Sequence, residues 1–74
     1  MFVIYGASWC SFCQKAKEAL SGKEYQFKDV DVVENIDEMF GLLGYEPLTV
    51  PQVFHDGNRI GGYSELVKFL SEQG

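Results

Sequence analysis

The order of apolar and polar residues in the first half of the chain predicts a strand, a helix and a second strand. Residues 2–5 are continuously apolar, which indicates a strand buried on both faces. Residues 11–20 carry apolar side chains at helical spacing, and Ser21-Gly22 provides a stop. That helical pattern consists of Phe12, Ala16, Ala19 and Leu20. Residues 25–32 are rich in aromatic and β-branched residues and predict the second strand.

The second half predicts another helix, a hairpin and a final helix. An apolar stripe closes near Gly44, and Asn35 is a candidate cap for the start of this helix. The stripe consists of Ile36, Met39, Phe40 and Leu43. Val53-Phe54 and Arg59-Ile60 flank Asp56-Gly57, a dipeptide suited to the positive φ angles of a two-residue turn. The last helix is marked by Tyr63, Leu66, Val67 and Leu70.

The predicted order of elements is therefore βαβαββα. A strand, helix, strand sequence with short connections implies a right-handed crossover and parallel pairing. A four-stranded mixed sheet covered by three helices satisfies the whole order, which is an α/β fold in one domain of residues 1–74.

Composition and charge narrow the class of protein. Hydrophobic residues make up 46% of the 74 residues, enough for one core, so the chain is not disordered. The net charge of −5 disfavours binding to nucleic acids or to anionic membranes. We interpret Glu34, Asp37 and Glu38 as a solvated helix face.

The chain has neither a membrane-spanning pattern nor a signal-peptide pattern. No apolar run approaches the roughly 20 residues that a membrane-spanning helix needs. The first residues lack a basic segment followed by a long apolar region, so we expect a cytoplasmic protein. Because that compartment keeps thiols reduced, two cysteines three positions apart indicate reactive or metal-binding residues.

Cys10 and Cys13 lie where the first strand gives way to the first helix. The unpaired N–H groups and the dipole of a helix start favour a thiolate, which is the nucleophile of disulfide exchange. We therefore assign Cys10 as the attacking nucleophile. Cys13, one turn later, is placed to resolve the mixed disulfide.

Two other interpretations of the cysteine pair are buried apolar residues and part of a zinc site. A structural zinc site needs four ligands, and the chain offers one histidine, His55, beside a turn. Since the pair lies at a strand-to-helix junction in a βαβ pattern, redox chemistry is favoured and no metal is expected.

Two more motifs precede predicted elements. Pro51, in Thr49-Val50-Pro51, cannot donate into a sheet ladder and is typical of a strand start; its peptide-bond isomer is not determined by the sequence. Gly61-Gly62 allows close backbone approach, and the helix start at Tyr63-Ser64-Glu65 suits a carboxylate ligand. An ordinary hairpin exit is the alternative interpretation of the glycine pair.

Together these motifs resemble those of the glutaredoxins, a family with the thioredoxin fold, and the resemblance extends over essentially the whole chain. Its length and the run Pro51-Gln52-Val53-Phe54 are similar to bacteriophage glutaredoxins in particular. The motifs are Tyr5, Trp9-Cys10-Ser11-Phe12-Cys13, Thr49-Val50-Pro51-Gln52-Val53-Phe54, Asp56-Gly57 and Ile60-Gly61-Gly62-Tyr63-Ser64-Glu65-Leu66.

The resemblance implies a monomeric dithiol enzyme that reduces protein disulfides and glutathione mixed disulfides, with glutathione as co-substrate. Ribonucleotide reductase is an implied protein partner. The implied glutathione site consists of Phe12, Thr49, Val50, Pro51, Gly62, Tyr63, Ser64 and Glu65. In it, Val50 offers backbone hydrogen bonds, Pro51 is cis, and backbone N–H groups of the helix start meet a carboxylate.

Three positions depart from the family pattern. Ser11 replaces a common proline, Ala7 stands where many members carry a lysine, and Glu65 replaces a more usual aspartate near the γ-glutamyl end. We therefore expect weaker affinity for glutathione than is usual in the family.

Two alternative functions follow from the same motifs. One is a redoxin of this shape recharged by thioredoxin reductase instead of glutathione. The other is a module in which Cys10 of two chains and two glutathiones hold a [2Fe–2S] cluster. Exchange is favoured, because a cysteine pair is more often used that way.

Overall fold

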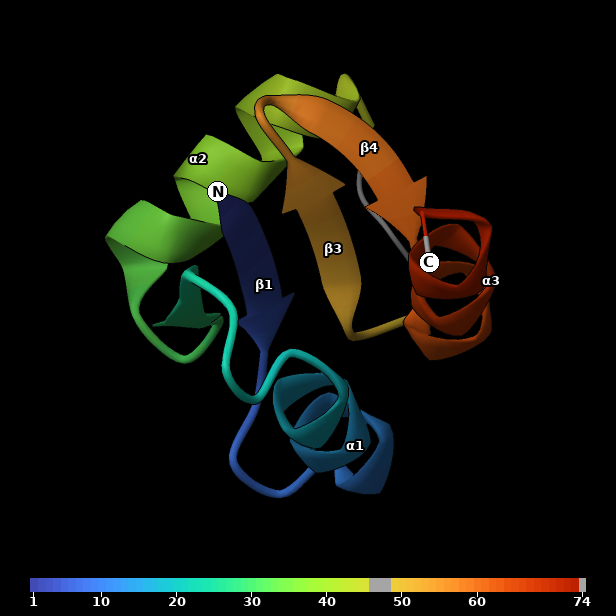
Figure 1. The fold of residues 1–74 in the computed structure, drawn as a ribbon. Helices are drawn as coiled ribbons and strands as arrows, with labels where there is room; N and C mark the ends of the chain where they lie inside the picture. The colour runs from blue at the N-terminus through green and yellow to red at the C-terminus, as the bar shows by residue number, and fades with distance from the viewer. Residues whose placement is uncertain (46–48, 74) are drawn as a thin grey trace.

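Four strands and three helices follow one another in the predicted order (Figure 1). The computed structural model describes residues 1–45 and 49–73. The elements are β1 (Phe2–Gly6), α1 (Ser11–Ala19), β2 (Tyr25–Asp29), α2 (Val33–Leu43), β3 (Gln52–His55), β4 (Asn58–Gly61) and α3 (Tyr63–Gln73). The sheet order is β2-β1-β3-β4, with β1 parallel to β2 and antiparallel to β3. The mixed sheet and the thioredoxin fold are confirmed.

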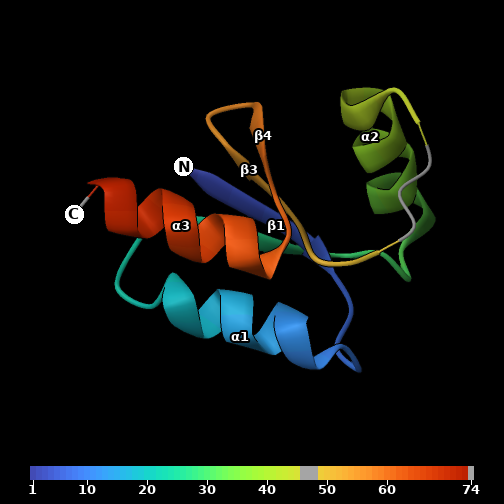
Figure 2. The same cartoon turned by 90° about the vertical axis from the view of Figure 1, so that its right-hand side faces the viewer.

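The central strand β1 contributes to a core on each face of the sheet. Phe2 and Ile4 belong to the cluster that α1 and α3 cover, whereas Val3 and Tyr5 belong to the cluster beneath α2. Figure 2 shows this layering, with α1 and α3 side by side on one face and α2 on the other. A strand packed on both faces has no polar face, which is why this run is continuously apolar.

The two helices on the larger core depart from their apolar stripes at one position each. Phe12 is 53% exposed, and the first turn of α1 instead buries Cys13. On α3, Val67 is exposed while Phe69 packs against the core. Apolar spacing therefore located both helices, but it does not distinguish Val67, or Phe12, which the family resemblance placed at the glutathione groove, from the side chains that reach the core.

The segment between β2 and α2 corrects two predictions. The second strand ends at Asp29 instead of continuing to Val32, because the Asp29 carboxylate accepts a hydrogen bond from the N–H of Asp31 at 2.8 Å and closes a turn. Asn35 does not cap α2. The cap position is Val32, without a side-chain hydrogen bond, and Asn35 donates from within the first turn to the Asp29 carbonyl at 2.9 Å.

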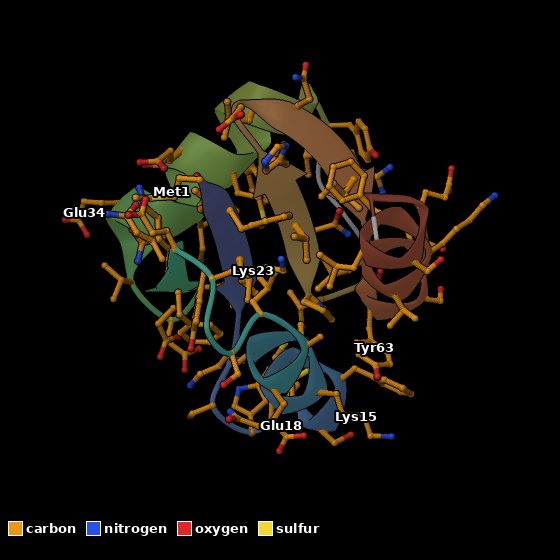
Figure 3. All side chains as sticks on the ribbon, viewed as in Figure 1. Met1, Lys15, Glu18, Lys23, Glu34 and Tyr63 are labelled. Atoms are coloured by element: carbon orange, nitrogen blue, oxygen red, sulfur yellow. The ribbon has the colours of Figure 1, made fainter. Side chains whose placement is uncertain are left out.

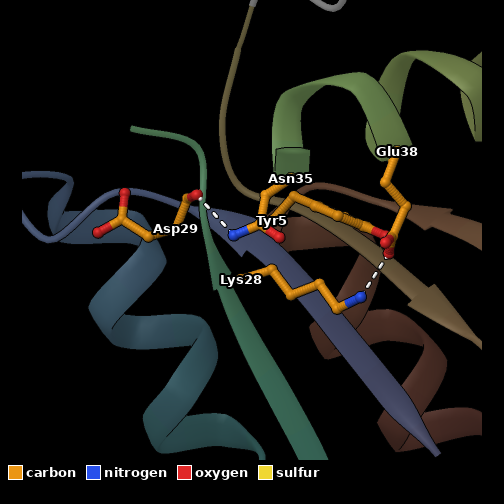
Figure 4. Close-up of polar contacts among 5 residues, drawn as sticks. All are labelled: Tyr5, Lys28, Asp29, Asn35 and Glu38. Carbon is orange, nitrogen blue, oxygen red and sulfur yellow. Dashed lines mark hydrogen bonds and ion pairs between the residues drawn. The ribbon is translucent and has the colours of Figure 1, made fainter. Parts of the chain in front are cut away.

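Polar contacts connect α2 to the sheet (Figure 4). Glu38 accepts hydrogen bonds from the Tyr5 hydroxyl on β1 and from the Lys28 ammonium on β2. Burial, followed by the bond to Glu38, raises the pKa of Tyr5 above its ordinary value. The bonds from Lys28 and Tyr5 lower the pKa of Glu38. These contacts fix the orientation of α2 beside β1.

The hairpin between β3 and β4 has the predicted tight turn. Asp56 and Gly57 have φ angles of 50° and 85°, so both adopt the left-handed conformation that a two-residue turn requires. The amino-terminal ammonium binds the Asp56 carboxylate, which ties the start of β1 to the turn. Among residues 1–45 and 49–73, no helix has the length and apolar character to cross a bilayer.

Candidate active site

Cys10 occupies the cap position at the start of α1. Its backbone is extended, at φ −93° and ψ 116°, and its N–H donates to the Ala7 carbonyl at 3.2 Å. The Cys10 Sγ accepts a hydrogen bond from the backbone N–H of Cys13 at 3.2 Å. A helix N-terminus with an N–H directed at sulfur is the setting in which a protein stabilises a sulfur anion.

The same sulfur lies against a second loop that is distant in sequence. Cys10 Sγ is 3.7 Å from the carbonyl oxygen of Val50, to which the thiol donates. The Val50–Pro51 peptide bond is cis, and Pro51 is buried immediately before β3. Tertiary structure therefore brings the end of β1 and the start of β3 together around one sulfur atom.

Cys13 is fully buried beneath Cys10. Burial first, and then the hydrogen bond of its thiol to Cys10, raise the pKa of Cys13 to about 12. The two thiols thus differ in the way that an attacking and a resolving cysteine differ: one is accessible, and the other is protected until its partner has reacted.

Gly6 makes the room that the Cys13 sulfur occupies. A Cβ at position 6 would lie 2.6 Å from Cys13 Sγ, far inside van der Waals contact. This requirement is absent from the sequence-based site. Its one signal is a glycine at the end of a buried strand shortly before the cysteine pair.

A cleft beside Cys10 contains every residue of the predicted glutathione site. Its volume is about 370 Å³, within the usual range for ligand pockets. The lining residues are Phe12, Thr49, Val50, Pro51, Gly62, Tyr63, Ser64 and Glu65. The structure brings these eight residues together, and their binding role stays a prediction.

One wall of the cleft is aromatic and has a cation beside it. The rings of Phe12 and Tyr63 lie 5.9 Å apart, and the Lys15 ammonium lies 5.0 Å from the centre of the Phe12 ring. Figure 3 shows Lys15 on α1 and Tyr63 at the start of α3 on the same side of the molecule. An apolar wall with a nearby positive charge suits an anionic ligand.

The opposite end of the cleft is the N-terminus of α3. Here Glu65 folds back and accepts hydrogen bonds from the N–H of Gly62 at 2.7 Å and from the Ser64 hydroxyl at 2.9 Å. These bonds, in that order, lower the pKa of Glu65. The N–H groups of Tyr63 and Ser64 belong to the first turn and have no acceptor within the helix.

Ala7 and Ser11 are the other two positions that depart from the family pattern. Ala7 is fully buried, so the place of the usual lysine is an enclosed one. Ser11 is the first residue of α1 and is exposed. Within the part of the chain that the structure describes, no three His, Cys, Asp or Glu side chains gather as metal ligands.

A cysteine pair at a strand-to-helix junction, facing a cis-proline loop on this mixed sheet, defines a dithiol redox protein of the thioredoxin fold. The Glutaredoxin family model matches residues 2–60. The chain therefore belongs to the glutaredoxin family, whose members are thiol–disulfide oxidoreductases, and its two close cysteines support the same redox role.

Individual relatives agree in sequence and fold. The chain is 33% identical to the glutaredoxin of Enterobacteria phage T4 over 86 residues, covering 95% of this chain and 99% of that one. It matches the structure of reduced Escherichia coli glutaredoxin with a TM-score of 0.77 at 35% identity, covering 96% and 93% of the two chains. A buckwheat glutaredoxin–glutathione complex shares the fold, with a TM-score of 0.76, 23% identity and coverage of 97% and 69%.

Proposed function

We propose that this chain is a glutathione-dependent dithiol glutaredoxin that reduces protein disulfides and glutathione mixed disulfides. It works as a monomer of one domain in the cytoplasm, where glutathione keeps thiols reduced. The proposal rests mainly on the cleft beside Cys10, which joins an aromatic wall, the cis-proline loop and a helix N-terminus. A solved glutaredoxin–glutathione complex, that of buckwheat, has the same fold.

Each part of the cleft suits one part of glutathione. Backbone groups of Val50 pair with the cysteine of the tripeptide, while Phe12 and Tyr63 wall the groove. The N–H groups at the start of α3 receive a carboxylate. Since the Glu65 carboxylate already occupies the Gly62 N–H, it competes with that ligand carboxylate, which supports the expected weak affinity.

The chemistry proceeds by two exchanges and a recharging step. The Cys10 thiolate attacks one sulfur of the substrate disulfide, the S–S bond breaks, and the leaving thiolate takes a proton. Cys13 then loses its proton and attacks Cys10 Sγ, which releases the second substrate thiol and leaves a Cys10–Cys13 disulfide. Two glutathiones reduce this disulfide to the dithiol and become glutathione disulfide.

The test is turnover of a small glutathione mixed disulfide, with glutathione and glutathione reductase as the recharging system. Cys10→Ser is expected to abolish turnover, whereas the matched variant Cys13→Ser retains it, because glutathione itself can release the adduct on Cys10. Full activity of Cys10→Ser refutes the assignment.

The recharging system and the protein substrate need separate assays. The same turnover is measured with thioredoxin reductase in place of glutathione and its reductase; faster recharging by thioredoxin reductase overturns the glutathione dependence. Ribonucleotide reductase is the protein substrate that the family resemblance favours, and nucleotide reduction dependent on this chain and glutathione tests it.

A further inference from the structure

A second recess lies beside the glutathione cleft, beyond Thr49 and Val50. It has a volume of about 250 Å³ and lies between α2 and the loops that precede α1 and β3. Its walls are Trp9, Val30, Ile36, Phe40, Thr49 and Val50. We call it the α2 hollow. Thr49 and Val50 line both recesses, so they form the ridge that separates them.

The reactive sulfur sits on this ridge, because Cys10 Sγ contacts the Val50 carbonyl at 3.7 Å. A mixed disulfide has a glutathione half and a protein half, and the two extend from adjacent sulfur atoms. With the glutathione half in its cleft, the adjoining α2 hollow is a recess within reach of the protein half. The inference therefore rests on the proposed function.

The α2 hollow is apolar and has an unusually exposed wall. Trp9, the only tryptophan of the chain, lines the α2 hollow and is 73% exposed. Met39, which is buried, closes the floor of the hollow. Aromatic side chains of this kind act as anchors when a partner covers them.

Charge identifies the occupant. Residues 29–38, which run from the end of β2 into α2, contain five Asp or Glu and no Lys or Arg. Asp29 and Asp31 flank the lining residue Val30, and exposed Asp37 follows the lining residue Ile36. Glu38 turns the other way, to Tyr5 and Lys28, so it is not part of this rim.

A positive charge, Lys15, lies beside the neighbouring glutathione cleft. Figure 3 shows Glu34 on α2 and Lys15 on α1 at opposite sides, and the Lys15 ammonium lies beside the Phe12 ring that lines the glutathione cleft. An anionic tripeptide would therefore meet the Lys15 charge beside its cleft, and a basic protein segment would meet the carboxylates beside the α2 hollow.

We propose that the α2 hollow is the docking site for the protein half of the substrate. It selects segments that carry a large apolar residue next to the disulfide cysteine and Lys or Arg beside it. The apolar side chain enters the hollow against Trp9, and the basic residues meet Asp31 and Asp37. Acidic segments are disfavoured by the same carboxylates.

Binding is tested without any redox step. The reduced protein is titrated with short peptides in which serine replaces cysteine, followed by the fluorescence of Trp9. The three peptides carry leucine with lysines, leucine with glutamates, and serine with lysines. We expect the first to bind about tenfold more tightly than each of the others, on the scale of one buried leucine and a few exposed ion pairs. Equal affinities, or no change in Trp9 fluorescence, overturn the proposal.

Kinetics with two charge-reversal variants distinguish an effect at the α2 hollow from an effect of net charge alone. Asp37→Lys is expected to lower kcat/KM about tenfold for the glutathionylated leucine–lysine peptide and to raise it for the leucine–glutamate peptide. The matched variant Glu72→Lys, at the far end of α3, changes net charge equally and should leave both within twofold. Equal effects of the two reversals refute the docking site.

Failure of the proposed function would appear in a different measurement, the turnover of a small glutathione mixed disulfide. A small glutathione mixed disulfide does not reach the hollow, so its turnover should be the same in Asp37→Lys and in the native chain. If the native chain does not turn it over, the redox assignment fails. In that case, the binding of the serine peptides still tests the α2 hollow as a docking site.

Discussion

Replacing Gly6 with alanine places a methyl group where the sulfur of Cys13 lies. The added Cβ would be 2.6 Å from Cys13 Sγ, 3.1 Å from Cys13 Cβ and 3.2 Å from Cε2 of Phe27. Cys13 and Phe27 must move, and both are anchored between β1, α1 and β2. Overpacking of this kind costs about 1–3 kcal/mol.

The backbone effect has the opposite sign but is smaller. Alanine restricts the unfolded chain more than glycine does, which stabilises the folded state by about 0.4–1 kcal/mol where its conformation is compatible. We therefore expect Gly6→Ala to lower the free energy of unfolding by about 1–2 kcal/mol. In a domain of this size, that lowers Tm by about 4–16 °C.

A double-mutant cycle with Cys13→Ala assigns the cost to the sulfur. Without Sγ, Gly6→Ala should cost about 1 kcal/mol less than it does in the native chain, measured by urea unfolding under reducing conditions. If Gly6→Ala costs the same in both backgrounds, or nothing in the native chain, the close packing of Gly6 on Cys13 is refuted.

Three further outcomes follow from the titrating groups. Iodoacetamide near neutral pH should modify Cys10 alone, counted by mass spectrometry, because Cys13 is buried with a pKa near 12; equal labelling of both thiols contradicts this. The raised pKa of Tyr5 contributes stability that is complete below its ordinary value of 10.0 and declines above it. Urea unfolding between about pH 9 and 11 should therefore show a steeper loss of stability in the native chain than in Tyr5→Phe. The lowered pKa of Glu38 contributes stability that is complete above its ordinary value of 4.5 and is lost as pH falls. Glu38→Gln should therefore lose less stability on acidification than the native chain does. Identical acid-unfolding profiles of the two proteins would be inconsistent with the contacts of Glu38.

Local patterns in the sequence were sufficient for the element order because each pattern reports burial along one element. The continuous apolar run of residues 2–5 predicted a strand packed on both faces, and Asp56-Gly57 predicted the turn. Patterns were weaker at boundaries. The turn that ends β2 at Asp29 depends on one side chain bonding to a nearby N–H, and apolar spacing does not detect it.

The sequence by itself determined which cysteine caps the helix and which lies one turn inside it, since spacing at a strand-to-helix junction depends only on local geometry. It also supplied all eight residues of the predicted glutathione site, through resemblance. Only the tertiary structure decided that Val50 touches Cys10, that Gly6 yields its space to Cys13, and that Trp9 and α2 enclose a second recess. These features join segments far apart in the chain, and their distances are set by the packing of helices on the sheet, which no local pattern encodes.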